Sequence, residues 1–180
     1  MSRLTQISDA DASPEAASLF TAIKSKVGVV PNLYRVMANE PAVLAAALGF
    51  GDALSKGSFD QTTREAIALA VAGENKCDYC ASAHSAISKS LKVDAAEIAA
   101  RLHGKSADPK LNAILAFAVK VVDKRGLVSD ADVAAAKEAG LTQGEIVETV
   151  AVTVANILTN YINHVAETEI DFPVVRTQAA

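Results

Sequence analysis

Two cysteines and one histidine lie close together in the middle of the chain. They are Cys77, Cys80 and His84, and the sequence contains no other cysteine. On a helix that turns about 100° per residue, these three side chains fall within an arc of roughly 60°. Two thiols and an imidazole on one stripe of a helix suit thiol redox chemistry better than they suit generic packing.

The spacing of these residues predicts which sulfur is the nucleophile. A thiol reacts poorly until it loses its proton, and its ordinary pKa is about 8.5. A helix that starts near Lys76 places both cysteines in its first turn, where the helix dipole favours a thiolate. His84, one turn after Cys80, can accept the Cys80 proton or stabilise its anion. We therefore expect Cys80 to attack a peroxide and become a sulfenic acid, which Cys77 converts into a disulfide. Cys77, nearer the helix end, is expected to be the sulfur more open to an external reductant.

Other chemistries are compatible with parts of this pattern. A cysteine pair on an apolar helix can be inert core, although Lys76, Asp78 and Ser82 make this segment amphipathic. Two cysteines and a histidine offer three zinc ligands, but a structural zinc site has four and the chain has no second cysteine pair. Thioredoxin-type chemistry requires a βαβ context, which the sequence lacks. We therefore expect no metal and no cofactor.

Composition indicates an all-α protein without a nucleic-acid or membrane partner. Of its 180 residues 51% are hydrophobic and only 4% aromatic, and alanine is abundant, which favours helices. The net charge of −4 provides no basic patch for nucleic acid or anionic lipid. The first residues lack the apolar centre of a signal peptide, and no apolar run reaches membrane-spanning length. We expect a cytoplasmic protein, in which a Cys-x-x-Cys is catalytic more often than structural.

Capping and breaking signals divide nearly the whole chain into helices. Serine, threonine or aspartate precedes most predicted starts, and glycine follows several ends. The predicted ranges are 14–27, 31–37, 42–55, 61–72, 77–90, 95–103, 109–125, 130–139 and 143–167. Gly73 is expected to interrupt the fourth helix after about Ala72, before the fifth helix begins. Loops are short, so we predict a single domain over residues 1–180, with a core of about 14–168 and an irregular tail at 171–180.

Several predicted helices are apolar on more than one face. These are the segments 42–54, 66–72 and 147–158. A helix that is apolar all round is normally buried, and a chain of this size has little interior for three of them. We therefore expect a homo-oligomer, in which other subunits cover part of this surface.

A weak internal echo accompanies these helices. Glu65 and His84 are nineteen residues apart, and so are Glu145 and His164. This equal spacing would fit a degenerate helical-hairpin repeat in which only the first copy keeps its thiols. A register shifted by two residues aligns the predicted helix starts instead, so two alignments of the echo stay open.

The central stretch resembles a known signature. Glu65, eleven residues, Cys77, two residues, Cys80, three residues and His84 resemble the pattern Glu-x11-Cys-x2-Cys-x3-His of the AhpD-like alkylhydroperoxidases, in the carboxymuconolactone decarboxylase superfamily. The Arg64-Glu65 pair and the segment Val-Pro-Asn-Leu-Tyr-Arg-Val-Met-Ala-Asn-Glu-Pro resemble its peroxidase-related branch. The resemblance covers about residues 28–165. It implies an all-helical AhpD-like fold, trimers or hexamers, attack by Cys80, resolution by Cys77, and a proton relay of Glu65 and His84.

Three side chains of this signature region keep more than one interpretation. In the best-known members a histidine precedes the second cysteine, whereas this chain has Tyr79, whose phenol could still donate a hydrogen bond. Glu65 either joins the relay or, as part of Thr62-x-x-Glu65, caps its own helix. With Asp60 as the N-cap, Glu65 would be free to face inward. Tyr34 either lines the pocket or fills the core.

The sequence therefore predicts a thiol-dependent peroxidase acting on alkyl hydroperoxides or hydrogen peroxide. Its partner would be an external thiol reductant, either thioredoxin-like, lipoyl or of another kind. A redox-sensing oligomer with little turnover is the first alternative. A decarboxylase or lactone-processing enzyme of the same superfamily is the second, although such members generally lack the cysteine pair.

Overall fold

The computed structural model describes residues 2–178, and the regular secondary structure in that range is entirely helical. The all-α prediction is confirmed. The helices are α1 (Pro14–Val27), α2 (Asn32–Met37), α3 (Pro41–Leu54), α4 (Gln61–Glu74), α5 (Asp78–Ser90), α6 (Ala95–Leu102), α7 (Pro109–Asp123), α8 (Asp130–Glu138) and α9 (Gln143–Ala166). Within residues 2–178, no helix has the length and apolar character needed to span a membrane.

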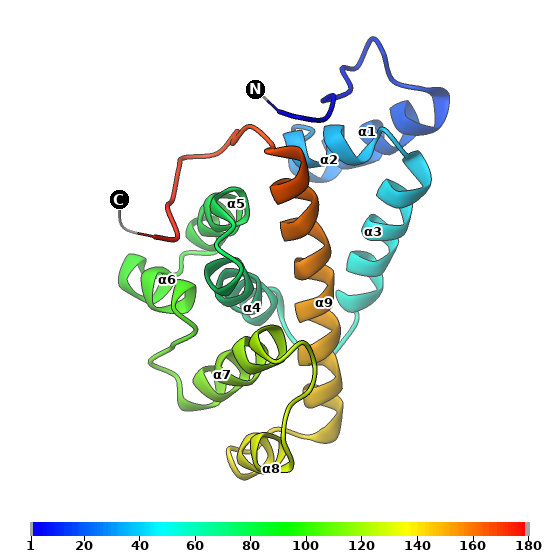
Figure 1. Cartoon of the computed structure of the whole chain (residues 1–180). Helices are drawn as coiled ribbons and strands as arrows, with labels where there is room; N and C mark the ends of the chain where they lie inside the picture. Colours follow the sequence, from blue (N-terminus) through cyan, green and yellow to red (C-terminus); the bar gives the residue numbers. More distant parts are fainter. Residues whose placement is uncertain (1, 179–180) are drawn as a thin grey trace.

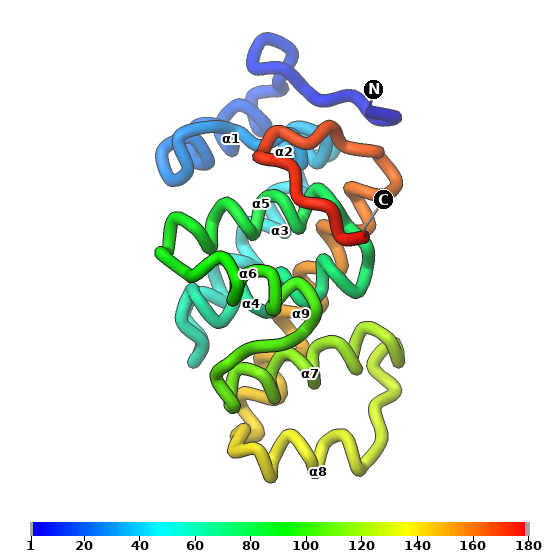
Figure 2. The backbone as a smooth tube through the Cα atoms, turned by 90° about the vertical axis from the view of Figure 1, so that its left-hand side faces the viewer, coloured from blue at the N-terminus to red at the C-terminus, as the bar shows by residue number. Residues whose placement is uncertain are grey.

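The long helix α9 forms the axis of the molecule. In Figure 1 it runs between α1, α2 and α3 on one side and α4 to α7 on the other. Figure 2 shows α1 and α2 near one end and α7 and α8 at the opposite end. The helix α4 lies at the centre of the second group and packs against α5, α6, α7 and α9. Elements that carry functional groups on α4, α5 and α9 are therefore brought against one another.

Two hydrophobic clusters share α4. One joins α1, α2 and the start of α5, and it includes both cysteines. The other joins α4, α7 and α9. Residues 66–72 of α4 are all buried, because its opposite faces serve the two clusters. The all-round apolar character of this segment is thus satisfied within the chain, without a second subunit.

The predicted caps explain where the helices begin. Asp60 accepts a hydrogen bond from the backbone N–H of Thr63 at 2.7 Å, which makes it the N-cap of α4. Thr142 and Glu145 form the reciprocal capping box that starts α9. The left-handed backbone of Gly28 ends α1, where the sequence predicts a stop. Local side-chain chemistry therefore sets most of the helix boundaries.

Gly73 does not end the helix α4, contrary to the prediction. The helix α4 continues through it to Glu74. A Cβ atom at this position would lie 1.8 Å from the backbone carbonyl oxygen of Leu102, at the end of α6. The glycine therefore permits a close approach of two helices rather than a bend.

The internal echo is not a second hairpin. Residues 65–84 span two helices, whereas 145–164 lie on the single helix α9. Glu145 caps its own helix and forms an ion pair with Lys110 at 2.7 Å. It is therefore engaged differently from Glu65, which faces His84.

The C-terminal tail is irregular, as predicted, over residues 171–178, and residues 179–180 lie outside the described residues. It runs beside α5 in both views (Figures 1 and 2). Asp78 accepts hydrogen bonds from the backbone N–H and the hydroxyl of Thr177 at 2.9 and 2.8 Å, and it also pairs with Arg176. The tail is therefore attached to the first turn of the helix that carries the cysteines.

Replacing Gly73 with alanine is expected to destabilise the protein by about 3 kcal/mol, because backbone of α6 would have to move away. Gly49 lies in α3 with open space around its Cβ position. Gly49→Ala should instead stabilise the fold by about 0.5–1 kcal/mol, as expected for an unhindered helical glycine. Urea unfolding of both variants measures the difference. Equal stability changes of the same sign would contradict the close approach at Gly73.

Candidate active site

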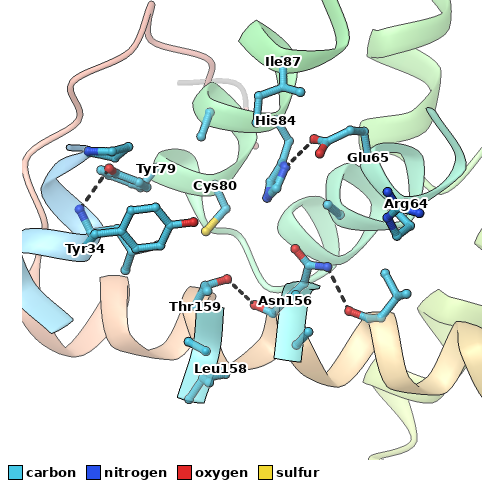
Figure 3. Close-up of a pocket in the computed structure, with 18 of the residues that line it drawn as sticks. Tyr34, Arg64, Glu65, Tyr79, Cys80, His84, Ile87, Asn156, Leu158 and Thr159 are labelled. Carbon is cyan, nitrogen blue, oxygen red and sulfur yellow. Dashed lines mark hydrogen bonds and ion pairs between the residues drawn. The ribbon is translucent and has the colours of Figure 1, made fainter. Parts of the chain in front are cut away.

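A cavity of about 330 Å³ lies between α9 and the helices on either side of it. Apolar side chains form most of its wall. They include Leu33, Ala47, Phe50, Leu54, Ala68, Ala83, Ile87, Val152, Leu158 and Phe172. The ionisable side chains on the wall are Tyr34, Arg64, Glu65, Tyr79, Cys80 and His84. Figure 3 shows Cys80 and His84 near the middle of this group, with Glu65 on the far side of His84. Three of the four predicted catalytic residues therefore share one cavity.

Cys77 determines how the cysteine helix begins. Its sulfur is the N-cap of α5 and accepts a hydrogen bond from the backbone N–H of Cys80 at 3.5 Å. The helix therefore starts at Asp78, one residue later than predicted, and Cys80 occupies its third position. Both cysteines are free thiols and both are buried, with 1% and 2% of their surface exposed. Cys80 lines the cavity and Cys77 lies behind it, in the core.

The surroundings of Cys80 favour its thiolate. The hydrogen bond from Cys77 lowers the pKa of the Cys80 thiol most, and burial opposes this effect. The side-chain amide of Asn163 donates to the sulfur at 3.3 Å, and Asn160 and Thr159 of the same helix lower the pKa further. The pKa of Cys77 is raised, because that thiol supplies the shared proton and is itself buried. Of the two sulfurs, Cys80 is therefore the one whose surroundings favour the anion, and Cys77 is the one that holds the proton.

Glu65 faces His84. Because Asp60 is the N-cap of α4, Glu65 falls in the second turn and does not form the capping box with Thr62. Its carboxylate oxygen Oε2 lies 2.7 Å from Nδ1 of His84. Burial lowers the pKa of His84, but the charge and hydrogen bond of Glu65 outweigh it, so the pKa of the imidazole is raised overall. This pair can hold a proton on His84 and release it into the cavity.

Tyr34 lines the same cavity. In Figure 3 its ring extends toward Cys80. Burial raises the pKa of its hydroxyl, and the negative charge of Glu65 raises it further, so the phenol stays protonated. Tyr34 therefore offers a neutral hydrogen-bond donor to the cavity that Cys80 also lines, rather than a purely apolar filling of the core.

Tyr79 has a different role from the one considered for it in the sequence. Its hydroxyl donates to Oδ1 of Asp171 at 2.8 Å and accepts from the backbone N–H of Leu33 at 3.0 Å. Its ring packs edge-on against Phe172 with centroids 5.8 Å apart. Although Tyr79 lines the cavity, its polar end therefore joins α2 to the C-terminal tail and is not directed to His84.

Cys77 is not the exposed sulfur that its place near the helix end predicts. Only 1% of its surface is accessible. It packs in the core cluster against which Phe172 and Val175 of the tail also pack, and Ser82 accepts a hydrogen bond from the backbone N–H of Val175 at 2.9 Å. The same cluster also contains residues of α1 and α2, which are distant in sequence. No set of three or more histidine, cysteine or acidic side chains within residues 2–178 could hold a metal ion.

The sequence analysis did not predict the asparagine that binds the thiol. Asn163 lies 83 residues after Cys80. The signal was present in α9, where buried polar side chains recur at intervals of four, seven and three residues, which keeps them on one face of a largely apolar helix: Thr149, Thr153, Asn160 and Asn163. Such a stripe indicates a buried polar partner, but its identity depends on which helix packs there.

The comparisons with known proteins agree with this geometry. The sequence model of the carboxymuconolactone decarboxylase family matches residues 41–124. A crystal structure from Ralstonia eutropha JMP134, described as an alkylhydroperoxidase AhpD core and an uncharacterized peroxidase-related protein, is similar over 94% of this chain and 92% of its own. Its identity is 26% and its TM-score 0.85. The predicted resemblance to the AhpD-like carboxymuconolactone decarboxylase superfamily is therefore confirmed.

Two further structures share the AhpD-like fold. An uncharacterized peroxidase-related protein from Silicibacter sp. TM1040 is 23% identical over 93% of this chain and 89% of its own, with a TM-score of 0.81. A variant of the debrominase Bmp8, in complex with 2,3,4-tribromopyrrole, is 18% identical over 94% of this chain and 91% of its own, with a TM-score of 0.78. No curated protein sequence matches the chain. Proteins described with different activities therefore share this helical fold.

Asn163→Leu is expected to raise the pKa of the Cys80 thiol, because it removes a hydrogen bond to the sulfur that favours the anion. The pH dependence of thiolate absorbance near 240 nm measures the change, and alkylation at neutral pH should slow by about tenfold. Tyr79→Phe serves as the control, since its hydroxyl binds Asp171 and Leu33. It should leave the titration of Cys80 unchanged. An unaltered titration in the Asn163 variant would contradict the assigned role of that amide.

Proposed function

We propose that this AhpD-like protein is a thiol-dependent peroxidase that cycles Cys77 and Cys80 between dithiol and disulfide. One observation carries the proposal: the sulfur with the lowered pKa opens onto the same cavity as the Glu65–His84 pair. A thiolate, a proton donor and a second thiol are the groups that reduction of a hydroperoxide requires. The apolar wall suits organic hydroperoxides, and hydrogen peroxide is small enough to enter as well.

The first step transfers one oxygen atom to Cys80. The thiolate attacks the terminal oxygen of the hydroperoxide, an S–O bond forms and the O–O bond breaks. The alkoxide that leaves takes the proton held on His84, so the products are an alcohol and the sulfenic acid of Cys80. Glu65 stabilises the protonated imidazole before the step, and the hydroxyl of Tyr34 is available to orient the peroxide.

The second step uses Cys77. Its sulfur loses its proton and attacks the sulfenic acid of Cys80, which releases water and forms the disulfide. The first turn of α5 already holds the two residues together, with the N–H of Cys80 on the sulfur of Cys77. Two electrons from an external thiol reductant then restore the dithiol. A thioredoxin-like protein or a lipoyl group would serve, in a reducing compartment such as the cytoplasm.

A second candidate function is reductive debromination, in which the same two thiols supply the electrons. The debrominase Bmp8 shares the fold at 18% identity. A dithiol can reduce a carbon–bromine bond, with the carbon gaining a proton, bromide leaving and the two thiols becoming a disulfide. The apolar cavity beside Cys80 would accept a small aromatic ring. Bromide release from tribromopyrrole should therefore be measured beside peroxide consumption. A redox sensor without turnover is a third outcome, and turnover counts separate it from both.

Cys80→Ser is expected to abolish peroxide consumption driven by a dithiol, because no nucleophilic sulfur then faces the cavity. Cys77→Ser should still consume one equivalent of peroxide per subunit and stop as a sulfenic acid at Cys80, which dimedone traps for mass spectrometry. Rates with cumene hydroperoxide and a panel of reductants provide the measurement. Retained turnover in the Cys80 variant would contradict the peroxidase proposal. Sulfenic acid at Cys77 in that variant would show that the assigned roles of the two cysteines are reversed.

We also propose that the protein acts as a homo-oligomer, in which second copies of the chain cover α9. Its exposed apolar residues recur every three or four positions and form a stripe: Val147, Val150, Val154, Leu158, Tyr161 and Val165. Residues 149–163 carry no charged side chain. A monomer seldom exposes so long an apolar surface, and a two-fold pairing of identical stripes would bury it. Leu158 also lines the cavity, so a partner on this stripe would lie next to the site.

Val154→Glu, in the middle of the α9 stripe, is expected to shift the protein to the monomer, because it would bury an unpaired charge in the interface. Leu127→Glu is the matched control, since Leu127 is highly exposed in the α7–α8 connection. Light scattering coupled to size exclusion gives the mass of each. A wild-type monomer at high concentration, or an oligomer unaffected by Val154→Glu, would contradict the assignment of this surface.

A further inference from the structure

Arg64 is the only lysine or arginine among the residues that line the cavity within the described chain. It lies in the first turn of α4, immediately before Glu65, and its side chain is half-buried. Neither the attack of Cys80 nor the proton on His84 requires this cation. Its presence on a mostly apolar wall therefore indicates that the side chain binds a ligand.

Arg64 has no acidic partner among residues 2–178. Its Nη1 donates to the backbone carbonyl of Phe59, which holds the side chain in place. Glu65 is engaged with His84, and Asp60 accepts from the backbone N–H of Thr63. Asp60 senses the charge of Arg64 only at longer range, since the two form no ion pair. The remaining guanidinium donors make no hydrogen bond within this part of the chain, although most other half-buried cations here are paired.

A guanidinium in this setting is suited to one kind of ligand. It offers parallel N–H donors that match the two oxygens of a carboxylate, and a partly dehydrated site strengthens the pairing. In the view of Figure 3, Arg64 lies beyond Glu65 and His84, on the opposite side of them from Cys80. Apolar side chains such as Phe50, Leu54 and Leu158 line the same cavity. A ligand with a carboxylate at one end and an apolar body could therefore reach from Arg64 to Cys80.

We propose that Arg64 binds the carboxylate of the substrate, and that the substrate class is a hydroperoxide of an apolar carboxylic acid. The proposal rests on the peroxidase function proposed above and uses the same reaction, with a hydroxy acid as the product. Hydrogen peroxide has no carboxylate to pair with Arg64, so this cation would distinguish the acid from smaller peroxides. Arg64 is a specificity residue, because it contacts the substrate away from the reacting oxygens.

The test compares two hydroperoxides that differ only in charge: that of an unsaturated fatty acid and that of its methyl ester. The wild type is expected to reduce the acid with about tenfold higher kcat/KM, through a lower KM. Arg64→Gln should remove this preference by lowering kcat/KM for the acid to the value for the ester, and Arg64→Lys should restore part of it. Equal loss on acid and ester would overturn the proposal, since that pattern belongs to a residue that only supports the fold. A wild type that does not distinguish them would also overturn it.

Binding without turnover separates the two proposals. Calorimetry with the unreactive fatty acid and its methyl ester uses the Cys80→Ser protein with and without Arg64→Gln. Tighter binding of the acid that disappears with Arg64→Gln supports the site, even if the wild type consumes no peroxide and the peroxidase function fails. Equal binding of acid and ester, or binding unaffected by Arg64→Gln, would overturn the carboxylate site whatever the enzyme assays give.

Discussion

The residue at which α5 begins determines the geometry of the whole site. Because the sulfur of Cys77 caps this helix, Cys80 falls at its third position, where unpaired backbone N–H groups and the helix dipole favour a negative charge. His84 then lies one turn further on the same face.

A buried thiolate is stable only if its neighbours replace the water it loses. Burial alone would raise the pKa of Cys80, and the donors around the sulfur outweigh that effect. They come from different parts of the chain: Cys77 from the start of the same helix, and Asn163 from α9. The cavity wall beyond them is apolar, so a charge formed there meets few competing dipoles. The lowered pKa of Cys80 is therefore a property of two packed helices, α5 and α9, and not of the cysteine motif alone.

The packing of α4 brings the second half of the chemistry to the same place. This helix is buried on opposite faces, and Gly73 lets the end of α6 approach its backbone closely. Its N-cap, Asp60, leaves Glu65 free to reach His84 rather than its own helix start. The C-terminal tail completes the enclosure through Asp171 and Thr177, which bind Tyr79 and Asp78 at the start of α5. The helix that carries the thiols is thus held from both sides.

Features that depend on neighbouring residues could be predicted from the sequence. Most helix limits followed from capping residues, and the shared stripe of Cys80 and His84 followed from the helical repeat, because both are set within a few residues. Features that depend on distant segments became visible only in the tertiary structure. Glu65 could cap or face inward until α5 packed against α4, and Tyr79 found partners in α2 and the tail. Cys77 is buried in a core cluster that remote elements help to form, and Asn163 binds Cys80 across 83 positions. A local pattern indicates the candidate reactive groups. Their protonation and exposure depend on which residues the rest of the chain packs around them.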